Sequence, residues 1–135
     1  MKNFSLSKNE RVKLKRDFQK VYTEGSFFYS SHNKLKLNYY LESSVNEFGI
    51  KAAFVVSKKA GNAVWRNRIK RLLREAYRNN KLPLQTICSQ KKMLLLMIFS
   101  PIRLNQKHNN KIKLEYIIDD FIGLLDKMKN NLENA

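Results

Sequence analysis

The chain has 135 residues, 43% of them hydrophobic, and carries 27 basic against 11 acidic side chains, for a net charge of +16. This length suits one domain with a modest core, and the apolar content excludes a disordered basic tail. A positive charge of this size indicates a polyanionic partner, and the longest apolar run, Met93 to Phe99, is too short to cross a bilayer.

The single cysteine, Cys88, cannot form an internal disulfide or a zinc site by itself. The first residues mix Phe4 and Leu6 with polar and charged side chains, so they do not read as a secretory signal. We therefore expect a cytoplasmic protein. The whole chain, 1–135, is predicted to be one domain, with residues 1–10 mobile.

The first helix is predicted from Arg16 to Glu24. Phe18, Val21 and Tyr22 are spaced i, i+3 and i+4, which places them on one helical face, and Gly25 is a natural stop.

Three strands are predicted next. Residues 34–41 alternate, with Leu35, Leu37, Tyr39 and Leu41 on one side and Lys36, Asn38 and Tyr40 on the other, which is typical of a half-buried strand. Residues 50–56 are more apolar, which predicts a more central strand that pairs with 34–41 as an antiparallel hairpin. Residues 27–29 could add a short edge strand.

The second half contains a basic helix from about Ala63 to Arg78 and a strand, Met93 to Phe99, that is apolar on both faces and ends at Pro101. Between them, residues 82–90 are compatible with either a short helix or a loop. Residues 103–110 read as a polar loop, and residues 111–130 as a helix with a wide apolar face. The order αβββαβα predicts an α+β sandwich with a small mixed sheet.

The basic helix lies in residues 58–78. This segment contains eight basic side chains and only one acidic one, which gives it a local net charge of +7. Gly61 and Asn62 precede it, where a tight turn and an N-cap fit. Its apolar stripe consists of Ile69, Leu72, Leu73, Ala76 and Tyr77. A solvated charged face is the rival interpretation, but the acids that normally alternate on such a face are missing.

The same segment reads Lys58-Lys59-Ala60-Gly61-Asn62-Ala63-Val64-Trp65-Arg66-Asn67-Arg68-Ile69-Lys70-Arg71-Leu72-Leu73-Arg74. It resembles the signature of the protein subunit of bacterial ribonuclease P and fills every position of Lys-Lys-x-Gly-Asn-Ala-Val-x-Arg-Asn-Arg-x-Lys-Arg-x-x-Arg. A second block, residues 16–25, looks like the first helix of that family. The resemblance is clear from residue 11 to 78 and weak beyond.

The resemblance implies a fold like domain 2 of ribosomal protein S5, with a left-handed crossover around the basic helix where right-handed crossovers are the rule. It also implies an endonuclease subunit that assists a catalytic RNA in removing the 5′ leader of precursor tRNA. The RNA would carry the catalytic Mg²⁺ ions, and the chain would hold no cofactor. The runner-up function is a non-catalytic ribosomal or RNA-chaperone protein.

Two groups of candidate site residues follow from the resemblance. Contacts with the catalytic RNA are expected from Lys58, Lys59, Asn62, Arg66, Asn67, Arg68, Lys70, Arg71 and Arg74, although Arg68 and Arg71 lie on different sides of the helix from Arg66. A cleft for the single-stranded leader is expected from Phe18, Tyr22, Lys36, Tyr40 and Ser57. Ordinary core packing is the alternative for these aromatic side chains.

No catalytic or metal-binding residue is predicted. His32 and His108 are isolated in polar surroundings and read as surface residues. Asp119 and Asp120 read as the solvated face of the last helix. Without a nucleophile–base set, the chain alone is not expected to hydrolyse a phosphodiester.

Overall fold

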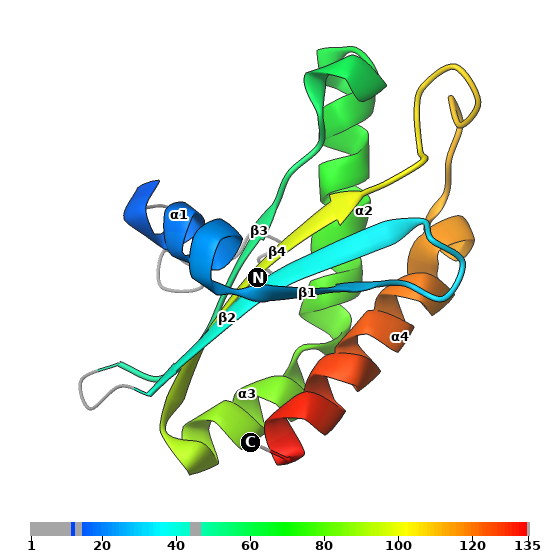
Figure 1. Cartoon of the computed structure of the whole chain (residues 1–135). Coiled ribbons are helices and arrows are strands. Elements are labelled where there is room, and N and C mark those ends of the chain that lie inside the picture. The colour runs from blue at the N-terminus through cyan, green and yellow to red at the C-terminus, as the bar shows by residue number, and fades with distance from the viewer. Residues whose placement is uncertain (1–11, 13–14, 44–46, 135) are drawn as a thin grey trace, which may run out of the picture.

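The computed structural model describes residues 12, 15–43 and 47–134. Figure 1 shows the elements in chain order. They are α1 (Lys15–Glu24), β1 (Ser26–Tyr29), β2 (Leu35–Ser43), β3 (Gly49–Phe54), the short 3₁₀ helix η2 (Lys58–Ala60), α2 (Ala63–Asn80), α3 (Leu82–Lys91), β4 (Met93–Pro101) and α4 (Leu114–Glu133). The predicted mobility of residues 1–10 falls outside the described residues.

The four strands form one mixed sheet in the order β1-β2-β4-β3. β2 pairs antiparallel with β1 and with β4, whereas β3 pairs parallel with β4. The predicted hairpin between β2 and β3 is therefore wrong, and so is the central position predicted for β3. β4 takes the centre because its six consecutive residues 94–99 are all buried, and only a strand covered on both faces can bury such a run.

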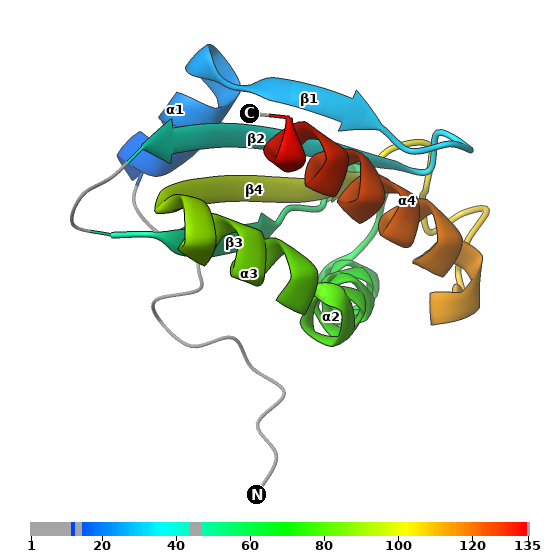
Figure 2. The same ribbon diagram turned by 90° about the horizontal axis from the view of Figure 1, so that it is seen from below.

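The chain passes from β3 to its parallel neighbour β4 through α2 and α3, which lie on one side of the sheet (Figure 2). This crossover is left-handed, as the resemblance implies. Residues 82–90 belong to α3, so of the two alternatives for this segment the helix is confirmed. Pro83 stands in its first turn, where a missing N–H costs no helical hydrogen bond.

The sheet has a core on each face. The larger core lies under α2, α3 and α4 and contains, among others, Leu37, Leu73, Phe99 and Phe121. The smaller core lies under α1 on the other face, which we call the open face, and consists of Val12, Val21, Leu94, Leu96 and Ile98. The predicted alternation of β2 is confirmed, because Leu35 and Leu37 enter the larger core while Tyr40 packs on the smaller one.

Asp120 of α4 is only 2% exposed, so the solvated face predicted for it is wrong. Its carboxylate accepts hydrogen bonds from Ser30 Oγ at 2.5 Å, from the backbone N–H groups of His32 and Lys34, and from His32 Nδ1 at 2.8 Å. These donors all come from the β1–β2 turn. The buried carboxylate therefore fixes that turn to α4.

Candidate nucleic-acid interface

The start of α2 is held in place by the sequence around its N-cap. Asn62 Oδ1 accepts from the backbone N–H of Trp65 at 2.9 Å, which confirms Asn62 as the cap. Gly61 is required by close approach, because a Cβ atom there would lie 2.6 Å from the Trp65 ring and 2.9 Å from Gln106 Cβ. Gln106 also accepts from the Asn62 backbone N–H at 2.8 Å. The loop before α4 thus fixes the direction in which α2 leaves η2.

The apolar stripe anchors α2 along its length. Trp65, Ile69, Leu73, Ala76 and Tyr77 are buried, whereas Leu72 is half-buried at the edge of the stripe. Because this stripe is packed against the sheet and α4, the basic side chains of the helix project from a rigid element rather than from a mobile tail.

The basic side chains of α2 lie on two different flanks. Arg66, Lys70 and Arg74 are spaced four residues apart and form one row. Helical geometry puts this row on the flank of Tyr77, whose ring contacts Phe54 of β3 at a centroid distance of 5.9 Å. The row therefore borders the β3 edge of the sheet.

Arg68 lies on the opposite flank of α2 from this row. Its Nε and Nη2 both donate to the carbonyl oxygen of Ile112, at 3.1 and 2.9 Å. Trp65 Nε1 likewise donates to the Asn109 carbonyl oxygen at 2.9 Å. Two residues of the signature segment are thus engaged with the loop that precedes α4.

The row of Arg66, Lys70 and Arg74 has no acidic partner within the described part of the chain. The ion pairs of Lys20 with Glu42, of His32 with Asp120 and of Lys51 with Glu47 do not involve this row. Like charges at i and i+4 destabilise a helix unless a counter-charge neutralises them. The row is therefore a surface of unneutralised positive charge suited to phosphate groups.

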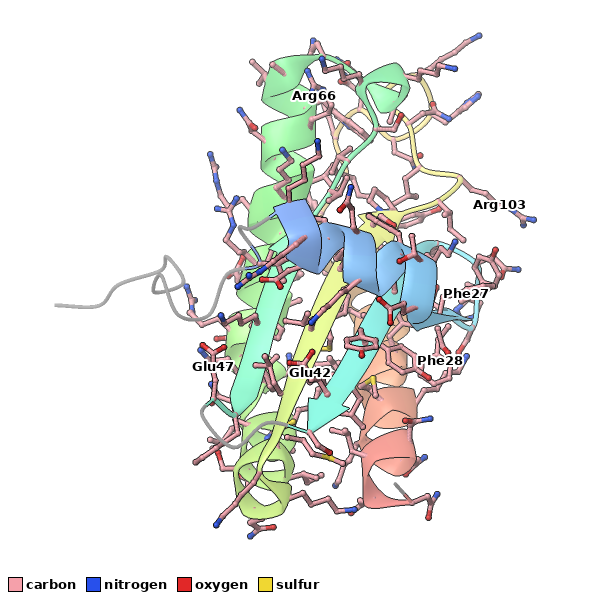
Figure 3. All side chains as sticks on the ribbon, turned by 60° about the vertical axis from the view of Figure 1, so that its left-hand side comes forward. Phe27, Phe28, Glu42, Glu47, Arg66 and Arg103 are labelled. Carbon is pink, nitrogen blue, oxygen red and sulfur yellow. The ribbon has the colours of Figure 1, made fainter. Side chains whose placement is uncertain are left out.

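The segment before α2 adds further positive charge. Lys58 and Lys59 are exposed on η2, and Ser57 caps this short helix by accepting from the Lys59 backbone N–H at 3.2 Å. Asn67 and Arg71 are exposed on the side of α2 that faces away from the core. Figure 3 shows Arg66 at the junction of η2 and α2, where its Nε donates to the Gly61 carbonyl oxygen at 3.1 Å.

The predicted cleft residues are divided by α1, which crosses the open face. Lys20, on one flank of α1, pairs with Glu42 at 2.9 Å, and its ammonium lies 5.9 Å from the centre of the Tyr40 ring. Phe18 and Tyr22 belong to the other flank. Tyr40 therefore lies beside Lys20, while Phe18 and Tyr22 border the part of the open face beyond α1.

Tyr22 and Phe18 differ in how far they are buried. Phe18 is half-buried against the smaller core, so core packing accounts for much of its surface. Tyr22 is 53% exposed, although partial burial still raises the pKa of its phenol above the ordinary value. Of the two aromatic side chains, Tyr22 is the one with a free ring face.

The structure adds an aromatic pair that the sequence analysis did not single out. Phe27 and Tyr29 of β1 are 50% and 46% exposed, and their ring centres lie 5.2 Å apart in an edge-to-face arrangement. Lys36 of β2, a predicted cleft residue, places its ammonium 4.5 Å from the Phe27 ring centre and 5.6 Å from that of Tyr29. The alternation Phe-x-Tyr next to a glycine is the only sequence signal for this pair.

Within the described residues, no group of three or more His, Cys, Asp or Glu side chains could hold a metal ion. His32 and His108 are both exposed, as predicted, and His32 also contacts Asp120. Burial raises the pKa of the Cys88 thiol to about 11, which disfavours the reactive thiolate. No helix among the residues described is both long and apolar enough to cross a membrane.

Comparison with known proteins connects these features with one family. The family model described as Ribonuclease P matches residues 6–119. A curated ribonuclease P protein component of Syntrophus aciditrophicus is 38% identical over 82 residues, which cover 60% of this chain and 64% of the relative. The corresponding protein of Streptococcus pneumoniae is 42% identical over 76 residues, which cover 56% and 58%. The matched segments thus span less than two thirds of the length of these two relatives.

Solved structures are similar over more of the chain. The RNase P protein of Staphylococcus aureus superposes with a TM-score of 0.67 at 22% identity, covering 89% of this chain and 95% of that one. The RNase P protein of Thermotoga maritima gives a TM-score of 0.65 at 23% identity, covering 87% and 96%. At these identities the structures show a shared fold.

Proposed function

Because the chain belongs to the ribonuclease P protein family, we propose that it is the RNA-binding protein subunit of ribonuclease P. In this proposal it assists a catalytic RNA in the endonucleolytic removal of the 5′ leader from precursor tRNA. The observation that carries the proposal is the row of Arg66, Lys70 and Arg74, which is rigidly mounted on α2 and has no acidic partner among the described residues.

The row would contact phosphates of the catalytic RNA. Arginine forms bidentate hydrogen bonds with phosphate, and lysine supplies a mobile point charge. Lys58, Lys59 and Arg71 are exposed nearby in the sequence and would extend this contact. Arg68 would contribute indirectly, by holding the loop before α4 against α2.

The leader would bind on the open face, beside α1. Tyr22 offers an exposed ring for stacking with an unpaired base, and Lys36 and Ser57 supply a charge and a hydroxyl group. Stacking tolerates any base because every base has an aromatic face, which suits a leader of variable sequence.

The division of labour between protein and RNA is part of the proposal. The protein would neutralise backbone charge and position the substrate, and the RNA subunit with its Mg²⁺ ions would carry out the chemistry. The described residues provide a charged surface and an aromatic platform for such a role. We propose that this complex acts in the cytoplasm, because a free cysteine such as the buried Cys88 is typical of proteins in a reducing compartment.

The test is reconstitution with a ribonuclease P RNA and a precursor tRNA. We expect the chain to lower the Mg²⁺ concentration needed for cleavage, and the triple variant Arg66→Ala, Lys70→Ala, Arg74→Ala to lose that effect. Each lost phosphate contact should lower the slope of log K against log salt by roughly 0.7 to 0.9.

The matched control is the triple variant Lys107→Ala, Lys111→Ala, Lys113→Ala, which removes the same charge from exposed positions in the loop before α4. It should retain most of the stimulation. Equal losses in both triple variants would mean that net charge, rather than the row on α2, binds the RNA. Cleavage by the chain without RNA would contradict the division of labour.

A further inference from the structure

The aromatic pair on β1, Phe27 and Tyr29, is exposed although the fold of the described residues does not require it. Phe27 and Tyr29 leave about half of their surface in water, whereas Phe28 between them points to the opposite face and stacks on Tyr39 at 5.1 Å. β1 could be anchored to the larger core through Phe28 alone. Two large rings side by side on a strand are therefore available to a ligand.

The register of the sheet places this pair next to the cleft. Tyr29 lies opposite Lys36 and Phe27 opposite Asn38, so both rings stand on the open face that also carries α1. β1 begins immediately after Gly25, at the end of α1, and runs away from the Lys20–Glu42 ion pair. The pair thus lies on the Tyr22 side of α1, and the two surfaces are continuous.

The charge around the pair is positive. Lys36 lies against both rings, and Figure 3 shows Arg103 and Phe27 projecting on the same side of the molecule. On this side of α1, the described open-face residues of β1 and of the neighbouring β2 and β4 are Phe27, Tyr29, Lys36, Asn38, Ile98 and Ser100. None of them is acidic. Exposed rings with interleaved cations are the chemistry of a single-stranded nucleic-acid site.

We propose that Phe27, Tyr29 and Lys36 form a second stacking platform for single-stranded RNA, which extends the leader site beyond Tyr22. This inference rests on the proposed function for the identity of the RNA, a longer 5′ leader. A base would stack on an exposed ring, and the Lys36 ammonium would move from the ring to the adjacent phosphate. The exchange is favourable because a base–aromatic stack is stronger than an exposed cation–π contact.

The direct test uses the chain alone and labelled single-stranded oligonucleotides from about 4 to about 16 nucleotides, the span of known single-strand site sizes. The double variant Phe27→Leu, Tyr29→Leu keeps apolar bulk on β1 and removes both rings. We expect it to bind long oligonucleotides at least about fivefold more weakly than the parent, the smallest loss that one stacked base would cause. The shortest oligonucleotides should bind the two proteins alike.

Two controls separate stacking from loss of structure. Tyr29→Phe keeps the ring and should bind as the parent does. Phe48→Ala removes a ring that is 49% exposed immediately before β3 and should also leave binding unchanged. Melting temperatures of all variants should agree within a few degrees.

A second arm uses the reconstituted holoenzyme with precursor tRNAs of increasing leader length. The double variant should lose affinity only for leaders longer than those at which Tyr22→Ala first shows a loss. If the parent does not stimulate the catalytic RNA at all, the proposed function is wrong. The oligonucleotide experiment still shows whether Phe27 and Tyr29 bind single-stranded RNA.

The platform is overturned if the double variant binds every oligonucleotide as the parent does, whatever the holoenzyme shows. It is equally overturned if the loss is the same at all lengths, or if Phe48→Ala gives the same loss. If the aromatic pair instead binds another protein, the double variant should bind every oligonucleotide as the parent does.

Discussion

Arg68 and Ile112 are joined by two hydrogen bonds, because Nε and Nη2 of the guanidinium group both donate to one carbonyl oxygen, at 3.1 and 2.9 Å. A lysine at this position could not reproduce the paired geometry, since it has a single nitrogen. The arginine thus ties the loop before α4 to the middle of the basic helix. A residue that reads from sequence as an RNA contact also has a structural role.

We therefore predict that Arg68→Lys lowers the melting temperature while Lys70→Ala does not. Losing hydrogen bonds from a charged donor costs about 1.5 to 3 kcal/mol when the site is buried, and less at this exposed one. In RNA titrations, Lys70→Ala should lower the salt slope and Arg68→Lys should leave it unchanged, because the positive charge remains. Weaker RNA binding by Arg68→Lys at an unchanged melting temperature would instead mean that the Arg68 guanidinium contacts a phosphate directly.

The apolar stripe of α2 allows a matched pair of core variants. Leu73 is fully buried and Leu72 is half-buried at the edge. Leu73→Ala should cost about 2 to 5 kcal/mol of unfolding free energy, whereas Leu72→Ala should cost clearly less. Urea unfolding of both proteins measures the difference. Equal losses would mean that the helix is rotated relative to the orientation described.

The buried carboxylate of Asp120 predicts a stability change with pH. Burial alone would raise the pKa of Asp120, but hydrogen bonds from Ser30, His32 and Lys34 outweigh it and lower the pKa below the ordinary 3.8. A carboxyl group with a lowered pKa in the folded state stabilises that state above pH 3.8, and the contribution is lost as the pH falls through the folded-state value.

Asp120→Asn should therefore destabilise the protein at neutral pH by about 1 to 3 kcal/mol, because buried donors lose their charged acceptor. The difference from the parent should shrink as the pH falls below 3.8. Asp119→Asn, which changes the exposed neighbouring carboxyl group, is the control. A difference that stays constant across the acid range would show that the charge of Asp120 is not what stabilises the turn.

The limits of the sequence analysis have physical causes in particular residues. The helices and strand segments could be predicted because their periodicity is local: the cap at Asn62 and the stripe of α2 occur where the pattern predicts. Strand pairing could not, because β3 and β4 are both apolar and period-2 alternation does not say which strand lies between two others. β4 lies inside the sheet and β3 at its edge because residues 94–99 of β4 are buried on both faces.

The site residues show the same division between local and long-range information. A charge run identified the basic helix, but the partner of Arg68 lies 44 residues away, and that of His32 lies 88 residues away. The exposure of Phe27 and Tyr29 depends on β1 being an edge strand whose open face α1 leaves uncovered. Such contacts follow from the tertiary fold and leave little trace in the neighbouring sequence.

Tyr22 is the residue at which core packing and leader binding make opposite predictions. Its ring is 53% exposed on the flank of α1 that faces away from the Lys20–Glu42 ion pair. Removing a half-exposed ring should cost little stability, so the melting temperature of Tyr22→Ala should stay close to that of the parent. Tyr116→Ala is the matched control, because Tyr116 is 46% exposed on α4, on the other side of the sheet.

As a stacking platform, the Tyr22 ring should contribute about 1 to 3 kcal/mol for each base that it stacks. We expect the holoenzyme with Tyr22→Ala to bind precursor tRNA with a leader of several nucleotides more weakly and to bind mature tRNA as the parent does. The preference for precursor over product should fall accordingly, while Tyr116→Ala should preserve it. If both variants weaken long-leader and leaderless tRNA equally, the leader does not stack on Tyr22, and the exposed ring has another role.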